Sequence, residues 1–245
     1  MGKFVFLLAL LTCASELPAQ PTAQAVESIP IPESALRLAR LIYPQDKVLE
    51  VRIKLYDAGV AASLKDDPGK AAWFSKYPGL LDIGISAGRA VLEKHIIASA
   101  PQRQDGCARF YAKNFSPAEI DQLISFYSSP TGSKLISGMY AGTNAAQMVA
   151  AIGPSADEHL TPEQTRDVQQ IARAQVRAQY SADDVKALAA FAASPVHAKL
   201  GQLRSAFSAL VASTEADPTL ETDINKAIEA SIIDYLAKHD GNRAK

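Results

Sequence analysis

Two stretches of the chain, residues 115–135 and 180–200, align without gaps at an offset of 65 residues (180 − 115 = 65). They are identical at 7 of 21 positions, where average composition would give about one or two. The identical pairs are Ser116/Ser181, Leu123/Leu188, Phe126/Phe191, Ser129/Ser194, Pro130/Pro195, Lys134/Lys199 and Leu135/Leu200. We interpret the stretches as two copies of one unit, the alternative being a chance likeness between two amphipathic helices.

The shared residues are those that fix the ends of helices. Ser116 and Ser181 stand where a helix N-cap is needed, and Ser116 is followed by Pro117 and Glu119 in the pattern of a capping box. Each Ser-Pro pair ends one helix and starts the next, because proline donates no N–H and disfavours helix at the residue before it. Each copy is therefore predicted to be a helix–elbow–helix unit. Neither copy can bury its apolar stripe alone, so we expect the copies to pack together or against flanking helices.

Helical patterns continue outside the repeat, and no stretch shows the alternation of a strand. The pattern predicts a loop over residues 66–69, a turn over 77–79, a helix start or kink at Pro101, and a last helix from about Asp217 to Gly241. Gly84 and Gly88 lie one helical turn apart, which indicates close packing of two helices. The sequence therefore predicts an all-α fold, a single multi-helix bundle-like domain with two related helix–elbow–helix units.

The domain boundaries follow from composition. Residues 20–32, which include Pro21, Pro30 and Pro32, are predicted to be a linker. The helical domain then covers residues 33–240, with repeat units at about 100–150 and 165–213, and residues 241–245 form a tail.

The N-terminal residues have the layout of a secretory signal peptide. Lys3 is followed by an apolar run over residues 4–11 and then by small residues. This run is much shorter than the roughly 20 residues that a membrane-spanning helix needs. We assign residues 1–19 to a signal peptide cleaved after Ala19, or alternatively after Ala25, and predict that the protein is periplasmic or secreted. Cys13 follows a poor match to a lipoprotein signal, so lipidation is not expected.

The first copy carries a motif with a family likeness. Residues 126–134 read FYSSPTGSK, and the lead-in over residues 111–119 reads YAKNFSPAE. Both resemble the bacterial family of the domain of unknown function 2059, over roughly residues 80–140. The second copy departs from the motif, with Ala192 in place of Tyr127 and His197 in place of Gly132. The resemblance implies an exported helical protein without established activity, and it supplies no site residues.

Charge and motifs argue against several classes of function. The net charge is −1 with no basic stripe, which excludes a nucleic-acid footprint. No stretch after the signal peptide is long and apolar enough to span a membrane. The sequence has no zinc-ligand spacing of the H-E-x-x-H or C-x-x-C kind. The chain's histidines are widely separated; they are His95, His159, His197 and His239. We assign the Asp157–His159 run to a solvated loop and the Asp183-Asp184 pair to helix capping.

We therefore predict no catalytic, cofactor-binding or metal-binding residues, no cofactor, and a protein that is not an enzyme. The preferred hypothesis is a periplasmic protein that acts through protein contacts, for instance in envelope maintenance, with a partner still unknown. The alternative is binding of a small apolar ligand or lipid between helices. An enzyme of unfamiliar type is the least favoured hypothesis, and it would require histidines and carboxylates to converge.

Two further features have open interpretations. Cys107 shares a helix face with Phe110 and Tyr111, which favours a buried thiol over a bridge between chains. Trp73 and Phe74 lie close to Tyr77 beside a predicted turn. They either close one end of the bundle or form a patch for a partner.

Overall fold

The computed structural model describes residues 30–66, 68–141, 180–215 and 217–241, and all regular structure in these ranges is α-helical. The helices are α1 (Glu33–Ile42), α2 (Gln45–Asp66), α3 (Pro68–Lys76), α4 (Leu80–Asn114), α5 (Pro117–Ser128), α6 (Pro130–Ala141), α9 (Ala182–Ala192), α10 (Pro195–Gln202), α11 (Arg204–Glu215) and α12 (Leu220–Gly241). This confirms the predicted all-α fold. The predicted signal peptide and the Asp157–His159 run lie outside the described residues.

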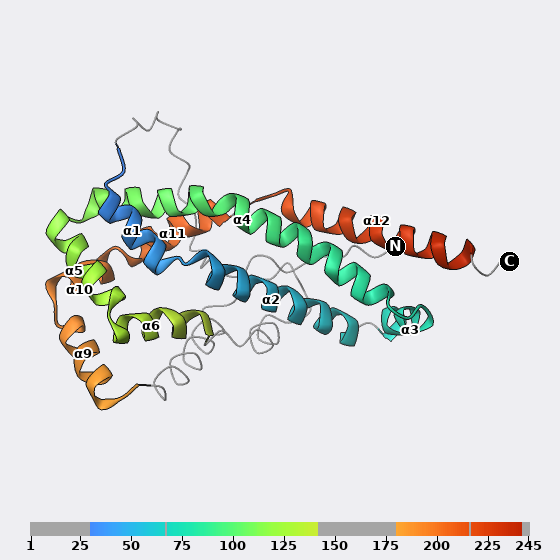
Figure 1. Cartoon of the computed structure of the whole chain (residues 1–245), viewed down its shortest axis with the longest axis horizontal. Helices are drawn as coiled ribbons and strands as arrows, with labels where there is room; N and C mark the ends of the chain where they lie inside the picture. Colours follow the sequence, from blue (N-terminus) through green and yellow to red (C-terminus); the bar gives the residue numbers. More distant parts are fainter. Residues whose placement is uncertain (1–29, 67, 142–179, 216, 242–245) are drawn as a thin grey trace.

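The long helix α4 is the central helix, against which most of the other helices pack. It contacts α12 and α2 along one half and α1 and α11 along the other (Figure 1). The elbows formed by α5, α6, α9 and α10 lie at one end of the molecule, and α3 lies at the opposite end (Figure 1). The first elbow is therefore separated from α3 by nearly the whole length of α4, while α6 reaches back to contact α2.

Glycines on α4 allow α12 to approach closely. A Cβ atom at Gly84 would lie 3.5 Å from Ile228 Cγ2, and one at Gly88 would lie 3.2 Å from Ile224 Cγ2. Ile224 is fully buried in this half of the core. The predicted role of the Gly84 and Gly88 pair in close helix packing is confirmed.

Two local boundaries differ from the prediction. Of the two predictions for Pro101, a helix start or a kink, the start is wrong, because Pro101 lies inside α4. The neighbouring Ala100 is buried, so α4 is packed against other helices at the point where proline removes a hydrogen bond. The predicted loop over residues 66–69 is also too wide, because Asp66 ends α2 and Pro68 is already the first residue of α3, where a missing N–H costs little.

A second part of the core joins α1 to the end of α4 and to α5. Its fully buried members include Leu38 of α1, Cys107 of α4 and Leu123 of α5. The thiol of Cys107 is thus buried, as predicted. Phe207 of α11 also packs here, with its ring centroid 5.1 Å from that of Phe110. The first elbow is therefore anchored to the main helix layer.

Candidate functional site: the paired elbows

The first elbow is built by two serine caps. The Ser116 hydroxyl accepts the Glu119 N–H at 3.3 Å, and the Glu119 carboxylate accepts the Ser116 N–H at 2.7 Å, which completes the predicted capping box. Ser129 then links α5 to α6. Its hydroxyl donates to the Phe126 carbonyl at 2.6 Å and accepts the Gly132 N–H at 3.0 Å.

The second elbow makes the same contacts at the equivalent positions, 65 residues further along. Ser181 and Asp184 form a capping box, with N–H to oxygen distances of 3.1 and 3.0 Å. The Ser194 hydroxyl donates to the Phe191 carbonyl at 2.6 Å and accepts the His197 N–H at 3.3 Å. The two elbows thus share a hydrogen-bond framework, while their origin by duplication stays a prediction.

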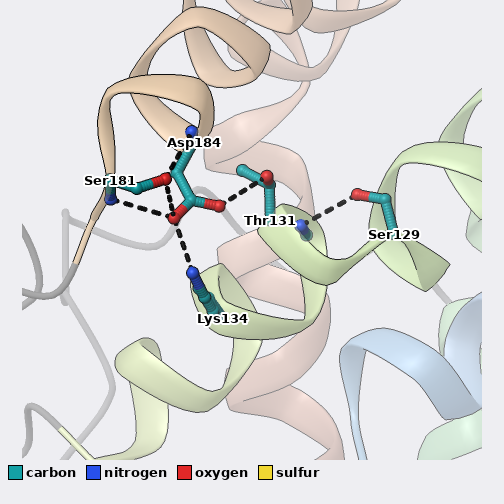
Figure 2. Close-up of polar contacts among 6 residues, drawn as sticks. Ser129, Thr131, Lys134, Ser181 and Asp184 are labelled. Atoms are coloured by element: carbon teal, nitrogen blue, oxygen red, sulfur yellow. Dashed lines mark hydrogen bonds and ion pairs between the residues drawn. The ribbon is translucent and has the colours of Figure 1, made fainter.

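Each elbow also supplies a lysine to the capping carboxylate of the other. Lys134 Nζ on α6 lies 2.6 Å from Asp184 Oδ2, and the Thr131 hydroxyl donates to Asp184 Oδ1 at 2.8 Å (Figure 2). In the opposite direction, Lys199 Nζ on α10 lies 2.8 and 3.0 Å from the two Glu119 carboxylate oxygens. Lys134 and Lys199 are equivalent in the repeat, and so are Asp184 and Glu119.

Because each elbow gives its lysine to the capping carboxylate of the other, the two elbows are related by an approximate two-fold axis. A residue near such an axis should meet its own counterpart. Phe126 and Phe191 are equivalent, and their rings stack with centroids 3.7 Å apart and planes 3° from parallel. We call this set of contacts, the two lysine–carboxylate pairs and the Phe126–Phe191 stack, the elbow clasp.

Electrostatics keep the clasp carboxylates charged. Lys134, the Ser181 N–H and the Thr131 hydroxyl hold the pKa of Asp184 well below its ordinary value. Lys199 and the Ser116 N–H lower the pKa of Glu119 in the same way. Every one of these groups stabilises the ionised form, so neither carboxylate is suited to carry a proton near neutral pH. The clasp is therefore a structural joint.

The outer faces of the two elbows differ sharply. On α5, the stripe of Ile120, Leu123 and Ile124 is buried, because α1 packs over it. The equivalent stripe on α9 consists of Val185, Leu188 and Ala189; Val185 and Ala189 are exposed, and Leu188 is half-buried. Ile120 is 2% exposed whereas Val185 is 53% exposed. Within the described residues, α9 contacts mainly α6 and α10, which leaves its outer face open.

The described histidines lie in separate places. His95 Nδ1 on α4 is 3.1 Å from Asp217 Oδ2, beside the start of α12. His197 packs edge-on against Phe191 in the second elbow, and His239 packs against Tyr235 near the end of α12. His159 lies outside the described residues. No three potential metal ligands gather within the part of the chain that the structure describes.

The sequence predicted only part of the elbow clasp. Sequence reasoning assigned Asp184 to helix capping, which is confirmed, but it missed the lysine that each elbow lends to the other. The signal was present, since Lys134 and Lys199 are identical in the alignment and Glu119 and Asp184 have the same charge. Within one copy, the lysine and the capping acid are not spaced to pair along a helix. Their recurrence in both copies therefore indicates that each lysine pairs with the acid of the other copy.

Comparison with known proteins adds one finding. Residues 104–156 match the model of DUF2059, an uncharacterised protein family conserved in bacteria. The match spans the end of α4, α5 and α6, and so contains the first elbow, as the resemblance of its motif predicted. No curated protein and no solved structure matches the chain. Among the described residues, no helix combines the length and the apolar character required to cross a bilayer.

Proposed function

We propose that this chain is an exported, non-enzymatic bacterial protein that binds another protein, and that the outer face of α9 is the contact surface. The observation that supports the proposal is the contrast between the buried Ile120 and the exposed Val185 at equivalent positions. Isolated exposed apolar residues are common, but here the same face of an equivalent helix is fully covered in the same molecule.

The shape of the face favours a helix as its occupant. On α5 the equivalent face receives α1, whose buried residues Ala35, Leu38, Ala39 and Ile42 follow a spacing of i, i+3, i+4 and i+7. The α9 face carries Ala189 and Ala192 where α5 has Ile124 and Tyr127, so a helix has room to approach closely. The clasp holds α9 rigidly against α6, which reduces the entropy lost on binding. We therefore propose an amphipathic helix of the α1 type in the partner.

Two assays test the proposal. In the first, the intact protein is used to capture partners from an envelope extract, together with the variants Val185→Lys and Ile97→Lys. Ile97 is 45% exposed on α4, far from the elbows, so it is a matched control. A charge in the middle of an apolar contact should weaken capture by about tenfold or more. Specific recovery should therefore be lost with Val185→Lys and kept with Ile97→Lys.

The second assay uses the chain's own helix as a probe. A labelled peptide of residues 30–43 should bind the intact protein, and binding should weaken by about tenfold in Val185→Lys. Equal binding by both proteins would mean that the peptide only exchanges with α1. If neither the peptide nor any extract protein depends on Val185, the proposed contact surface is wrong. Binding of an apolar ligand between the helices would then become the better hypothesis.

A further inference from the structure

The buried side chains of α4 fall into two groups along the helix. Ile96 is the last of them in the part of the core that α4 shares with α12, and Cys107 is the first in the part that it shares with α1. Between them, Ala100 and Arg103 are buried but belong to neither part. The apolar core of α4 is therefore interrupted here by a charged side chain.

Two other segments flank α4 at this level. The Gln104 amide donates to the Tyr43 carbonyl at 3.4 Å, which places the turn between α1 and α2 beside α4. A Cβ atom at Gly106 would lie 3.5 Å from Thr214 Cγ2, which places the end of α11 beside α4 as well (Figure 1). Arg103 precedes Gln104 and is only 6% exposed.

The buried guanidinium of Arg103 has few hydrogen-bond partners. Its Nη2 donates to the Ser99 hydroxyl at 2.9 Å, and Ser99 in turn donates to the Ile96 carbonyl at 3.3 Å. Its Nε is buried and has no hydrogen-bond partner. A guanidinium is always charged and carries five N–H donors, so a single neutral hydroxyl leaves both the charge and most of the donors uncompensated.

Arg89 on the same helix provides a comparison. Its Nη2 lies 2.7 and 2.8 Å from the two carboxylate oxygens of Asp57. Nε is buried without a partner in both arginines, but of the two only Arg89 has a carboxylate partner among the described residues. The Arg89 side chain is also 42% exposed, so its charge costs less to bury. The more deeply buried cation is thus the one without a counter-ion, although a buried charge is strongly destabilising when it is left unpaired.

From this contrast we propose that Arg103 binds an oxyanion, namely the carboxylate or phosphate group of a small ligand. A planar guanidinium donates two parallel hydrogen bonds to such a group, and a low local dielectric strengthens them. Ser99 is a positioning residue in this site, because its hydroxyl holds Nη2. The site lies on α4, apart from the proposed protein contact on α9, and neither proposal depends on the other.

The test compares the unchanged protein with Arg103→Met and with Arg89→Met, the same substitution on the same helix. Thermal unfolding is followed by circular dichroism in increasing sodium acetate or sodium phosphate, with the ionic strength held constant by sodium chloride. In the unchanged protein, Tm should rise along a saturable curve, by about 4 °C at ten times the Kd of the anion. The rise should persist in Arg89→Met and be absent in Arg103→Met. A response to acetate alone identifies a carboxylate ligand, and a response to phosphate alone identifies a phosphate group.

Two further measurements separate binding from a purely structural role of Arg103. Methionine keeps the apolar stem and removes the charge, so Arg103→Met in sodium chloride alone should have the same Tm as the unchanged protein or a higher one. Ser99→Ala keeps the arginine but removes the hydroxyl that holds it. This variant should weaken the binding of the effective anion by about threefold or more.

Two results would overturn the proposal. If acetate and phosphate affect the unchanged protein and Arg103→Met alike, or affect neither, Arg103 is not the binding group. If Arg103→Met is much less stable in sodium chloride alone or does not fold, Arg103 already has a stabilising partner within the folded chain and requires no ligand.

Discussion

The two elbows have the same polar framework but different apolar surroundings. Both are capped by a serine and an acidic residue, and both lend a lysine to the other. Yet α5 is covered by α1 and α9 presents its equivalent face to solvent. The comparison teaches that local sequence determines the caps and the elbow, because the partners are three residues apart. Burial depends on which other helix packs there, and that information lies elsewhere in the chain.

The largest expected difference between the elbows is in the cost of truncating the equivalent apolar residues. Ile120→Ala should lower the free energy of unfolding by about 3 kcal/mol, because it removes methyl groups from a closed core. Val185→Ala should change it by less than about 0.5 kcal/mol, because the side chain is already 53% exposed. Chemical denaturation of the three proteins, with the slopes compared as well as the midpoints, measures both values.

A large cost for Val185→Ala would contradict the comparison. It would mean that α9 is covered in solution by residues outside the described ranges, and that the proposed contact surface is already occupied. A small cost for Ile120→Ala would instead mean that α1 does not hold the first elbow.

The next difference concerns the third residue after each elbow serine. Gly132 has no room for a side chain, because a Cβ atom would lie 2.6 Å from Tyr127 Cα and closer still to the Phe126 carbonyl. The equivalent position carries His197, whose side chain is exposed. Gly132→Ala should therefore destabilise the protein by about 2 kcal/mol, in spite of the better helix propensity of alanine.

Gly201 provides the control for this substitution. A Cβ atom there would meet nothing within 4 Å, so Gly201→Ala in α10 should be neutral or stabilising by up to about 1 kcal/mol. Thermal unfolding of both variants tests the contrast. If Gly132→Ala were as stable as Gly201→Ala, the first elbow would be as open as the second.

The sequence predicted what depends on neighbouring residues. The capping box at Ser116, the turn at residues 77–79 and the last helix were all predicted from spacing. Contacts between distant segments were less accessible. The ion pair of Lys134 with Asp184 spans 50 residues, and that of Lys199 with Glu119 spans 80. Of the two predictions for Pro101, the helix start was wrong, because a helix that is packed along its length can continue through a proline.

The Phe126–Phe191 stack tests whether the elbows meet as the two-fold relation requires. A double-mutant cycle with Phe126→Leu and Phe191→Leu should give a coupling energy of about 1 kcal/mol, as expected for a stacked aromatic pair. Leucine keeps most of the buried volume, so the cycle isolates the ring contact. Additive effects of the two substitutions would show that the rings do not touch in solution.

The smallest expected difference lies in the response of the two capping carboxylates to acid. Both pKa values are lowered in the folded protein, from ordinary values of 4.5 for Glu119 and 3.8 for Asp184. Between the folded and the unfolded pKa the unfolded chain binds more protons, so this stabilisation is complete above the unfolded pKa and is lost as pH falls through the folded pKa. Asp184 accepts from Thr131 in addition to Lys134 and Ser181, so its contribution should persist to lower pH than that of Glu119.

Denaturation at a series of pH values separates the two carboxylates. Below about pH 5, the free energy of unfolding should fall as the pH is lowered. Glu119→Gln should reduce this fall in the upper part of the pH range, and Asp184→Asn should reduce it in the lower part. Stability that rises as the pH falls would reverse the sign of both shifts and would mean that the lysines are not at the carboxylates in solution. If the two variants change the stability over the same pH range, Thr131 does not stabilise the Asp184 carboxylate further. The two halves of the elbow clasp would then be equivalent in strength as well as in sequence.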